Sequence, residues 1–317
     1  MTHVALVSAD AALTLDEDMP PLVEAFRRLG ARVATPSWDA PDVDWSRFDL
    51  VLLRSTWDYV ERLDEFLAWA DACGRCTRLF NPAAVVAWNT DKHYLAELHA
   101  AGVAVVPTRF AEPGTRAAAS LQAFLAGGAG SLTAGAPCAF DQYVVKPTVG
   151  AGSRDAARYR RGDDDARALA HLSRLVEVER RSAMLQPYLA SVDTEGETAL
   201  MYLGGSPSHA IRKGPLLRLD DGLVAGLFAP EDIRPRVPSH DEQVLAEATL
   251  RSLPFESPLY ARVDMVRDAW GNPVLLELEL TEPSLFLAHA PGSADRLARA
   301  ALSRAAIAAE EVTDRST

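Results

Sequence analysis

Hydrophobic residues in the first part of the chain form short continuous runs that alternate with amphipathic stretches. The runs 4–7 and 50–53 are wholly apolar, which is typical of strands buried on both faces of a sheet. Between them, a proline pair at 20–21 opens a stretch with helical spacing of apolar residues, and Gly30 ends it. This alternation of strands and helices predicts a parallel sheet with right-handed crossover connections.

The rest of the chain is predicted to mix strands and helices, so the fold class is α/β with lobes of the α+β type. Apolar segments predict strands at 103–106, 143–146, 156–160, 183–189, 197–204, 207–213, 259–267 and 273–280. Amphipathic spacing predicts helices at 90–102, at 163–180, at 239–253 with a capping box formed by Ser239 and Glu242, and from residue 293 onward. A stretch rich in Gly, Ala and Ser at 126–137 is predicted to be a flexible surface segment.

Length and charge narrow the possible functions. A chain of 317 residues suits two or three packed lobes. Its formal net charge of −12 makes it a poor candidate for binding nucleic acid or an anionic membrane surface. No apolar run approaches the roughly 20 residues that span a bilayer, and the N-terminus lacks the features of a secretory signal peptide. We therefore expect a cytoplasmic protein.

The three cysteines do not form a disulfide framework. Cys73 and Cys76 make a C-x-x-C pair, which is compatible with a redox function or with half of a zinc site. No second pair of this kind follows. The spacing therefore favours two incidental thiols at the end of a helix.

The strongest chemical signal is a pair of glutamates in an apolar segment near the C-terminus. Glu277 and Glu279 alternate with leucines, so both lie on one face of the last predicted strand. If the preceding turn is tight and centred on residues 270–271, Asp264 lies opposite Glu277 and Arg262 lies opposite Glu279. A one-residue bulge would change this register.

Two interpretations of these acids are open. One is a solvated strand face with an ion pair between Arg262 and Glu279. The other is a metal site, because carboxylate oxygens and nucleotide phosphates are the usual surroundings of Mg²⁺. The surrounding Leu and Val residues indicate a strand inside a sheet. They favour a metal site with Asp264, Glu277 and Glu279 as ligands.

Two lysines precede features that suit phosphate groups. Lys146 ends a predicted strand and is followed by a loop of small residues at 148–153, whose backbone N–H groups can approach a polyphosphate. Lys92 lies in the first turn of a predicted helix, where a phosphate would offset its unfavourable interaction with the helix dipole. The alternatives are a plain hairpin loop and a surface lysine.

Two further segments carry weaker signals. Pro187 interrupts the predicted strand 183–189, so this strand is expected to bend or to lie at an edge, with backbone groups exposed to an adenine ring. The segment 54–59 follows the predicted strand 50–53, at the sheet edge where α/β proteins bind ligands. There Arg54 can bind a carboxylate bidentately. The alternative for 54–59 is helix capping by Ser55 or Thr56 with aromatic core packing.

The order of these features resembles the ATP-grasp superfamily, close to its glutathione-synthetase-like branch. A helix lysine, a strand-ending lysine with a small-residue loop, a Q-P-Y-L segment, R-x-D and E-x-E follow one another over nearly the whole chain. The resemblance implies a pre-grasp substrate domain at 1–88, a central lobe with the phosphate loop at 89–183, and a C-terminal lobe with the metal site at 184–317. It also implies ATP and two Mg²⁺ ions as cofactors.

The same resemblance implies a role for each matched residue. The nucleotide-binding residues are Lys92, Lys146, Thr148, Gly150, Ala151, Gly152, Ser153, Gln186, Pro187, Tyr188, Leu189 and Glu197, the last at the ribose. The metal ligands are Asp264, Glu277 and Glu279. Arg212, Lys213 and Lys146 stand where the family carries cations facing the reacting acyl phosphate. Two departures are Glu279, where many members have Asn, and Gln186, where an acidic residue is common.

A narrower resemblance involves the L-R-S-T-W-D-Y segment at 53–59 and the L-x-E-L-T-E-P-S segment at 276–284. They resemble the cyclo-ligases that close O-ureido-D-serine into D-cycloserine. This likeness implies a small amino-acid-like substrate held by Arg54, Ser55, Thr56, Asp58, Thr281 and Ser284, and a homo-oligomer. The alternatives are a ligase that joins two molecules through an amide, and an inactive nucleotide-binding scaffold.

Overall fold

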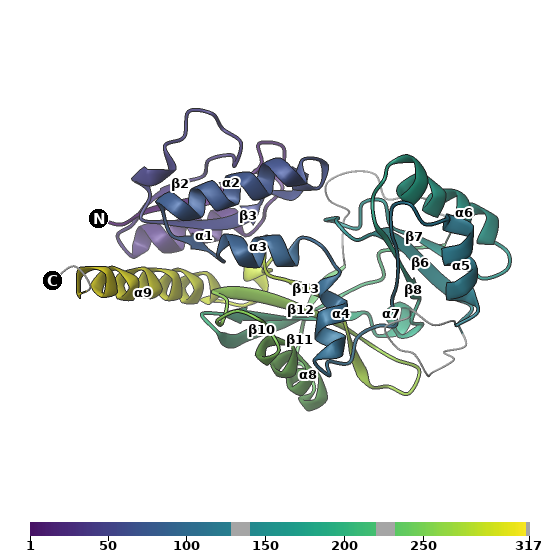
Figure 1. The fold of residues 1–317 in the computed structure, drawn as a ribbon. Coiled ribbons are helices and arrows are strands. Elements are labelled where there is room, and N and C mark those ends of the chain that lie inside the picture. The colour runs from purple at the N-terminus through teal and green to yellow at the C-terminus, as the bar shows by residue number, and fades with distance from the viewer. Residues whose placement is uncertain (128–139, 220–231, 315–317) are drawn as a thin grey trace.

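The structure is a computed structural model that describes residues 1–127, 140–219 and 232–314. Within these residues the strands form three sheets, two of four strands and one of five. Figure 1 shows an N-terminal layer, a central lobe to one side, and a C-terminal lobe whose sheet runs beneath the N-terminal layer in this view. Most of the surface segment predicted at 126–137 lies outside the described residues.

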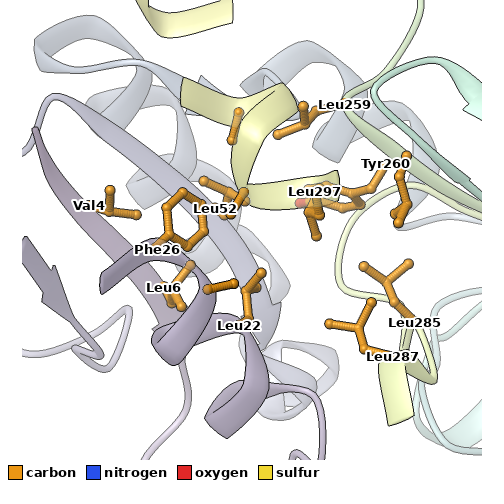
Figure 2. Packing of buried hydrophobic residues seen from close by; sticks show 14 of the residues in the cluster. Val4, Leu6, Leu22, Phe26, Leu52, Leu259, Tyr260, Leu285, Leu287 and Leu297 are labelled. Carbon is orange, nitrogen blue, oxygen red and sulfur yellow. The ribbon is translucent and has the colours of Figure 1, made fainter. Parts of the chain in front are cut away.

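The first sheet is parallel throughout, as predicted. Its strands in spatial order are β2 (Arg32–Ala34), β1 (His3–Ser8), β3 (Leu50–Ser55) and β4 (Leu79–Phe80). Its helices are α1 (Met19–Arg28) and α2 (Leu63–Cys76), with short 3-10 helices at Trp45–Arg47 and Trp57–Glu61. Phe26 of α1 and Leu52 of β3 pack in a buried cluster that also contains Leu297 of the C-terminal lobe (Figure 2). The N-terminal layer and the C-terminal lobe therefore share one hydrophobic core.

The second sheet is antiparallel and forms the central lobe. Its strands in spatial order are β5 (Arg109–Ala111), β8 (Ala183–Pro187), β6 (Gln142–Pro147) and β7 (Ala157–Arg160). Its helices are α5 (Ala117–Leu125), α6 (Asp165–Ser173) and a π-helical turn at Arg174–Val178. Because β8 lies between β5 and β6, the prediction of an edge strand is wrong. Pro187 is the last residue of β8, beyond the pairing with β5, so its missing N–H removes no bond to that strand.

The third sheet is antiparallel and belongs to the C-terminal lobe. Its strands in spatial order are β11 (Ile233–Arg236), β10 (Ser206–Lys213), β9 (Glu197–Leu203), β12 (Tyr260–Arg267) and β13 (Pro273–Glu279). The helices around it are α3 (Ala83–Asn89), α4 (Tyr94–Ala100), α7 (Ser191–Thr194), α8 (His240–Arg251), α9 (Ser293–Asp314) and a 3-10 helix at Leu287–His289. The predicted capping box is present at the start of α8. The predicted strand 103–106 is reduced to a single bridge between Val105 and Leu275.

The sheets do not follow the predicted domain bounds at every point. The bound at residue 88 falls inside α3, and the bound at residue 183 falls on the first residue of β8. The domain bounds stay a prediction. Among the described residues, no helix has the length and the apolar character required to cross a membrane.

The two faces of the third sheet have different neighbours, because side chains alternate along each strand. On β9, Leu200 belongs to a core that includes residues of α3, α4 and α8, and Met201 belongs to the core shared with α1 and α9. On β12, Val263 lies in the first of these cores, so its neighbours Arg262 and Asp264 lie on the opposite face. We call this second face the acidic face.

The hairpin of β12 and β13 has the predicted partners, with Asp264 opposite Glu277 and Arg262 opposite Glu279. Nearer the turn, the register differs from the predicted one by a single residue, because Met265 pairs with Leu275 instead of Leu276. A bulge then shifts the register by one residue between Asp264 and Met265. Without this bulge, Asp264 would pair with Leu276, and Glu277 would lie on the other face.

The segment 280–287, directly after β13, is held in place by the N-terminal layer. Asp18 accepts hydrogen bonds of 2.5, 3.1 and 2.7 Å from three consecutive backbone N–H groups at 285–287. Arg54 donates a hydrogen bond of 3.0 Å to the carbonyl of Pro283 and lies 3.4 Å from Asp18. These contacts are almost wholly buried, so they fix the path of the chain that leaves the acidic face.

Replacing Asp18 tests this anchoring. We expect Asp18→Ala to lower the free energy of unfolding by about 3 kcal/mol, because three buried N–H groups lose their acceptor and Arg54 loses an ion-pair partner. Urea denaturation followed by tryptophan fluorescence measures the loss. The control is Asp295→Ala, which removes a 2.9 Å ion pair with Arg28 from a half-exposed site and should cost less than about 1 kcal/mol. Equal losses in the two variants would contradict the anchoring role.

Candidate active site

One cleft receives most of the residues that the sequence predicted for chemistry. It is lined by the third sheet, by the second sheet with the loop after β6, and by residues of the N-terminal layer. The predicted site residues that line it are Lys92, Lys146, Gly150, Ala151, Gly152, Ser153, Gln186, Pro187, Tyr188, Leu189, Glu197, Lys213, Glu277, Glu279 and Ser284. Residues far apart in the sequence therefore meet at one place.

Basic side chains hold the carboxylates of the acidic face. Lys213 Nζ lies 2.7 Å from Asp264 Oδ2 and 3.0 Å from Glu197 Oε2. Arg262 donates a hydrogen bond of 2.9 Å to Asp264 and a second one to Glu279. Asp264 is 1% exposed, so its charge depends on both of these partners.

Burial and neighbouring charges move the pKa values of these acids in opposite directions. Burial raises the pKa of Asp264, but Arg262 and Lys213 outweigh it and bring the pKa to about 2. Burial also raises the pKa of Glu279, Arg262 opposes it, and Glu277 and Asp264 raise it further, to about 8. A cation bound at Glu279 would favour the ionised form of its carboxyl group.

The two predicted phosphate lysines differ in their surroundings. Lys92 Nζ lies 3.1 Å from Glu277 Oε1 and donates a hydrogen bond of 2.8 Å to the carbonyl of Gly150. Burial lowers the pKa of Lys92, but the charge of Glu277 outweighs it and the pKa is raised. Lys146 is half-buried and makes no hydrogen bond or ion pair with any residue that the structure describes. Burial holds the pKa of Lys146 below its usual range. The charge of Glu277 raises this pKa, and the charge of Lys92 lowers it further.

The loop after β6 presents its small residues to the cleft. Gly152 and Ser153 have φ values of 59° and 58°, in the left-handed region that lets consecutive N–H groups turn toward one side. Thr148, which was predicted to contact the nucleotide, is 1% exposed and lies behind the loop. Its N–H donates to the carbonyl of Ser182, and its carbonyl accepts from the N–H of Lys92, both at 3.0 Å. Thr148 therefore anchors the loop.

The opposite end of the cleft is apolar. Its walls include Val106, Val144, Leu189, Val192, Val266 and Leu276. Gln186 turns its side chain to Thr108, with Nε2 2.9 Å from Oγ1. The ring of Tyr188 lies 3.4 Å below the guanidinium carbon of Arg158. A slot with such walls suits a flat, mostly apolar ring.

The segment 54–59 contributes other residues to the cleft than predicted. Trp57 and Tyr59 line the cleft, and both also pack in a buried hydrophobic cluster, as the alternative interpretation predicted. The residues that were predicted to bind substrate but lie outside the cleft are Arg54, Ser55, Thr56, Asp58 and Thr281. Apart from Asp58, each of these is at most 1% exposed. Asp58 accepts a hydrogen bond of 2.9 Å from Trp38. Their placement does not support direct contact with a ligand.

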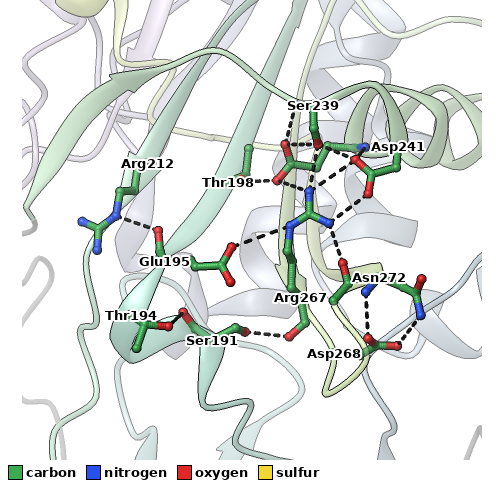
Figure 3. Close-up of polar contacts among 12 residues, drawn as sticks. Ser191, Thr194, Glu195, Thr198, Arg212, Ser239, Asp241, Arg267, Asp268 and Asn272 are labelled. Carbon is green, nitrogen blue, oxygen red and sulfur yellow. Dashed lines mark hydrogen bonds and ion pairs between the residues drawn. The ribbon is translucent and has the colours of Figure 1, made fainter.

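Lys213, and not Arg212, faces the acids, because neighbouring residues of β10 point to opposite faces. Arg212 donates a hydrogen bond of 2.7 Å through Nε to the carbonyl of Glu195, and Figure 3 shows it directed there, beside the network around Arg267. Arg212 does not line the cleft. The catalytic role predicted for it is therefore not supported by its placement.

The sequence reasoning overlooked Glu282, which lines the cleft and is 8% exposed. It follows Glu279 by three residues, so the alternation that identified Glu277 and Glu279 does not include it. The aromatic ring of Phe286 lines the cleft as well. The available signal was the T-E-P-S stretch, in which an acid directly follows the strand.

The donor set suits magnesium, although it is occupied by basic side chains. In the described part of the chain, no three Asp, Glu, His or Cys side chains are gathered into a ready metal site. Arg262 and Lys213 hold Asp264, and Lys92 holds Glu277. Carboxylate oxygens nevertheless are the ligands that Mg²⁺ prefers, so these residues fit the ion once the basic groups turn to another anion.

The C-x-x-C pair has no visible part in this site. Cys73 is buried and Cys76 is exposed, and both are free thiols. Burial raises the pKa of Cys73 to about 12, which keeps this thiol protonated and unreactive at neutral pH. Neither cysteine lines the cleft. This placement supports the interpretation of two incidental thiols.

Comparisons with known proteins agree with this geometry. Residues 4–81 match the family model of the N-terminal domain of D-cycloserine synthetase DcsG. The cycloserine biosynthesis protein DcsG of Streptomyces lavendulae is 41% identical over 311 residues, covering 96% of this chain and 99% of the relative. This chain belongs to the DcsG family.

The family also has a solved structure. The crystal structure of D-cycloserine synthetase DcsG matches this DcsG-family chain with a TM-score of 0.86 and 40% identity, covering 96% of this chain and 99% of the other. The ATP-grasp ligase PsnB, in a complex with minimal precursor, Mg and ADP, matches with a TM-score of 0.61 and 17% identity, over 96% and 97% of the two chains. The predicted ATP-grasp fold is confirmed, and the chain is a ligase that forms carbon–nitrogen bonds.

The two lysines of this DcsG-family site should respond differently to substitution when no nucleotide is present. Lys92→Met removes the ion-pair partner of buried Glu277 and should cost about 3 kcal/mol of unfolding free energy. Lys146→Met removes a cation that has no ion-pair partner and should change stability by less than about 1 kcal/mol, or raise it. Chemical denaturation of the nucleotide-free variants compares them. A larger loss for Lys146→Met than for Lys92→Met would contradict the charge pairing described here.

Proposed function

We propose that this enzyme is an ATP-dependent cyclo-ligase that converts O-ureido-D-serine into D-cycloserine. The substrate carboxylate takes the γ-phosphoryl group of ATP to give an acyl phosphate and ADP. A nitrogen of the same molecule then displaces phosphate and closes the ring, and one water molecule hydrolyses the carbamoyl group, which leaves as CO₂ and ammonia. The observation that carries the proposal is that a chain similar over its full length to DcsG has one cleft with an apolar slot, two lysines and a row of carboxylates.

The nucleotide is proposed to lie along the cleft with its base in the apolar slot. The adenine would contact the hinge residues Gln186, Pro187, Tyr188 and Leu189, and Glu197 would hold the ribose. The phosphates would lie at Lys92, Lys146 and the loop residues Gly150, Ala151, Gly152 and Ser153. Support comes from Lys146, whose ammonium lacks a partner among the described residues, and from Thr148, which braces the loop.

Two magnesium ions are proposed to bind at Asp264, Glu277 and Glu279. When bound, these ions would offset the negative charge that develops during phosphoryl transfer. The chain contributes hard oxygen donors on one strand face. The raised pKa of Glu279, about 8, is caused by burial and by Glu277 and Asp264 despite Arg262, and it indicates that this carboxyl is poised to gain a cation.

The remaining chemistry is assigned to basic side chains at the same place. Lys146 and Lys213 would stabilise the oxygens of the transferred phosphoryl group, in the role predicted for them with Arg212. Arg262 lies between the acids and the substrate end, since its Nη1 also donates to the carbonyl of Ser284 at 3.0 Å. Closure of the loop 150–153 would keep water from the acyl phosphate.

The substrate is proposed to occupy the end of the cleft formed by the N-terminal layer. Trp57, Tyr59, Ser284 and Phe286 line this end and leave room for a small molecule beside Arg262. The predicted residues Ser55, Thr56, Asp58 and Thr281 would act through these neighbours, from the layer behind them. Arg54 would act in the same way, by fixing the segment that carries Ser284.

An intermolecular carboxylate–amine ligase is the alternative within the same fold. Such an enzyme needs room for a second amino acid, and its product contains both molecules. The cyclising enzyme incorporates no second amino acid. An inactive scaffold is disfavoured because the described cleft retains basic and acidic groups for phosphoryl transfer.

A substrate panel separates these functions. Purified enzyme with ATP and Mg²⁺ should release ADP with O-ureido-D-serine at least about tenfold faster than with its L-isomer or with pairs of common amino acids. Mass spectrometry should find D-cycloserine and no amide of two amino acids. ADP release that requires two different amino acids would overturn cyclisation, and ATP binding without consumption of any substrate would favour the scaffold.

The metal assignment predicts a large kinetic effect at Glu277. Glu277→Gln should lower kcat for substrate-dependent ADP release at least about 100-fold and shift the Mg²⁺ requirement to higher concentration, because one anionic ligand is lost. The control is Glu247→Gln on α8, where a half-exposed glutamate pairs with Arg251 and should leave the rate unchanged. Full turnover by Glu277→Gln would show that the metal ligands are assigned incorrectly.

The homo-oligomer and the cytoplasmic location that the sequence suggested stay predictions. Light scattering of the purified protein measures its mass in solution and decides the first of these. Neither enters the argument for the reaction.

A further inference from the structure

Glu282 differs from every other acid that lines the cleft. It is the third residue of the anchored segment 280–287, and its backbone carbonyl accepts a hydrogen bond of 3.2 Å from Trp57 Nε1. This bond uses the main chain alone, so the N-terminal layer positions Glu282 while leaving its carboxylate to face the cleft. At 8% exposure, the residue is almost wholly removed from solvent.

The Glu282 carboxylate lacks the ion-pair partner that its neighbours have. Glu277 is paired with Lys92, Glu279 with Arg262, and Glu197 with Lys213. No lysine, arginine or histidine nitrogen of the described residues lies within 4.0 Å of the Glu282 carboxylate. A buried carboxylate without a cation is costly, which indicates that a ligand supplies the positive charge.

The surroundings of Glu282 favour one kind of cation. The Tyr59 hydroxyl lies near the Glu282 carboxyl group and lowers its pKa, and Trp57, Tyr59 and Phe286 line the same cleft. A carboxylate, a hydroxyl oxygen and aromatic faces match the three N–H donors and the compact charge of an alkylammonium group.

We propose that Glu282 and Tyr59 form the subsite that binds the primary ammonium group of the amino-acid substrate. The proposal rests on the proposed function, which supplies a substrate with an α-ammonium beside the carboxylate that is phosphorylated. Binding the ammonium at Glu282 would turn that carboxylate toward Arg262 and the acidic face. Glu282 is then a residue that selects amino acids over simple carboxylic acids.

Burial raises the pKa of Glu282 to about 7, with the charge of Lys92 and the Tyr59 hydroxyl opposing the rise. The carboxyl is therefore only partly ionised in the empty cleft at neutral pH. A bound ammonium favours the ionised form, so part of the binding free energy is used to release the proton. The groups that face Glu282 are thus Lys92, Tyr59 and, by its charge, Glu277.

The test compares two ligands and two forms of the holoenzyme, assayed with ATP and Mg²⁺. One ligand is O-ureido-D-serine, and the other is its analogue with hydrogen in place of the amino group. Glu282→Gln should raise KM for O-ureido-D-serine about 10- to 100-fold and change kcat much less, because a charge-assisted contact is lost. The same substitution should leave the KM or inhibition constant of the deamino analogue within about threefold or lower it, because the analogue offers no cation to the carboxylate.

Controls separate this subsite from a structural or a proton-transfer role. Glu247→Gln, the same change at a half-exposed position of α8, should leave the KM and the affinity of both ligands unchanged. Tyr59→Phe should weaken the amino ligand by a smaller factor than Glu282→Gln. Calorimetric titration of O-ureido-D-serine into each form with ADP and Mg²⁺ gives the affinity even for a variant without turnover, and melting curves verify folding.

The outcomes distinguish the subsite from the proposed function. If the wild type neither binds nor consumes O-ureido-D-serine, the proposed function fails. If the wild type binds and consumes O-ureido-D-serine and Glu282→Gln lowers the affinity for both ligands equally, the ammonium subsite is wrong while the proposed function stands. A fall in kcat alone, equal for both ligands, would assign Glu282 to proton transfer and would also overturn the subsite.

Discussion

Buried carboxylates can share one face of a sheet only where positive charge lies beside them. The third sheet meets this condition through strand alternation, which turns Asp264 and Glu277 to the same face as the basic groups of Lys213 and Arg262. Each basic group is paired with an acid. A phosphate could replace the acid as the partner of the basic group, and a metal ion could replace the basic group as the partner of the acid. The ion pairs thus stabilise the cleft and at the same time keep the donors of the proposed metal site apart.

The chain leaving the acidic face is fixed by a different lobe. Asp18 and Arg54 bind the segment 280–287 through its backbone, in contacts that are nearly free of solvent. The N-terminal layer therefore sets the distance between the acidic face and the end of the cleft that Trp57 and Tyr59 line. Arg54 thus contributes to this geometry without lining the cleft, and the two lobes also share one hydrophobic core.

Much of this could be predicted from the sequence because it depends on local periodicity. Alternation alone placed Glu277 and Glu279 on one face, and the buried runs of the first lobe indicated a parallel sheet. The orientation of neighbouring residues was harder to predict. Arg212 and Lys213 are both basic, and only the pairing of β10 within the sheet determines which of them faces the acids. Trp57, Tyr59 and Glu282 were missed for a similar reason. These residues lie in segments that follow strands, where no periodic pattern predicts the direction in which a side chain points. Contacts between the lobes decide which of these side chains reach the cleft.

The two ends of the cleft differ in charge. Among the described residues, Lys146 has no ion-pair partner beside the small-residue loop, and the Glu282 carboxyl has none beside Trp57 and Tyr59 of the N-terminal layer. Between them, the acidic face is nearly balanced by its own basic groups. A bound pair of molecules is therefore favoured when its phosphates lie at Lys146 and its cationic group lies at Glu282. The reacting carboxylate would then fall between these ends, beside Arg262. Under the proposed function, these two charged groups would set the order in which the reactants lie along the cleft, which an apolar cleft of the same shape would not do.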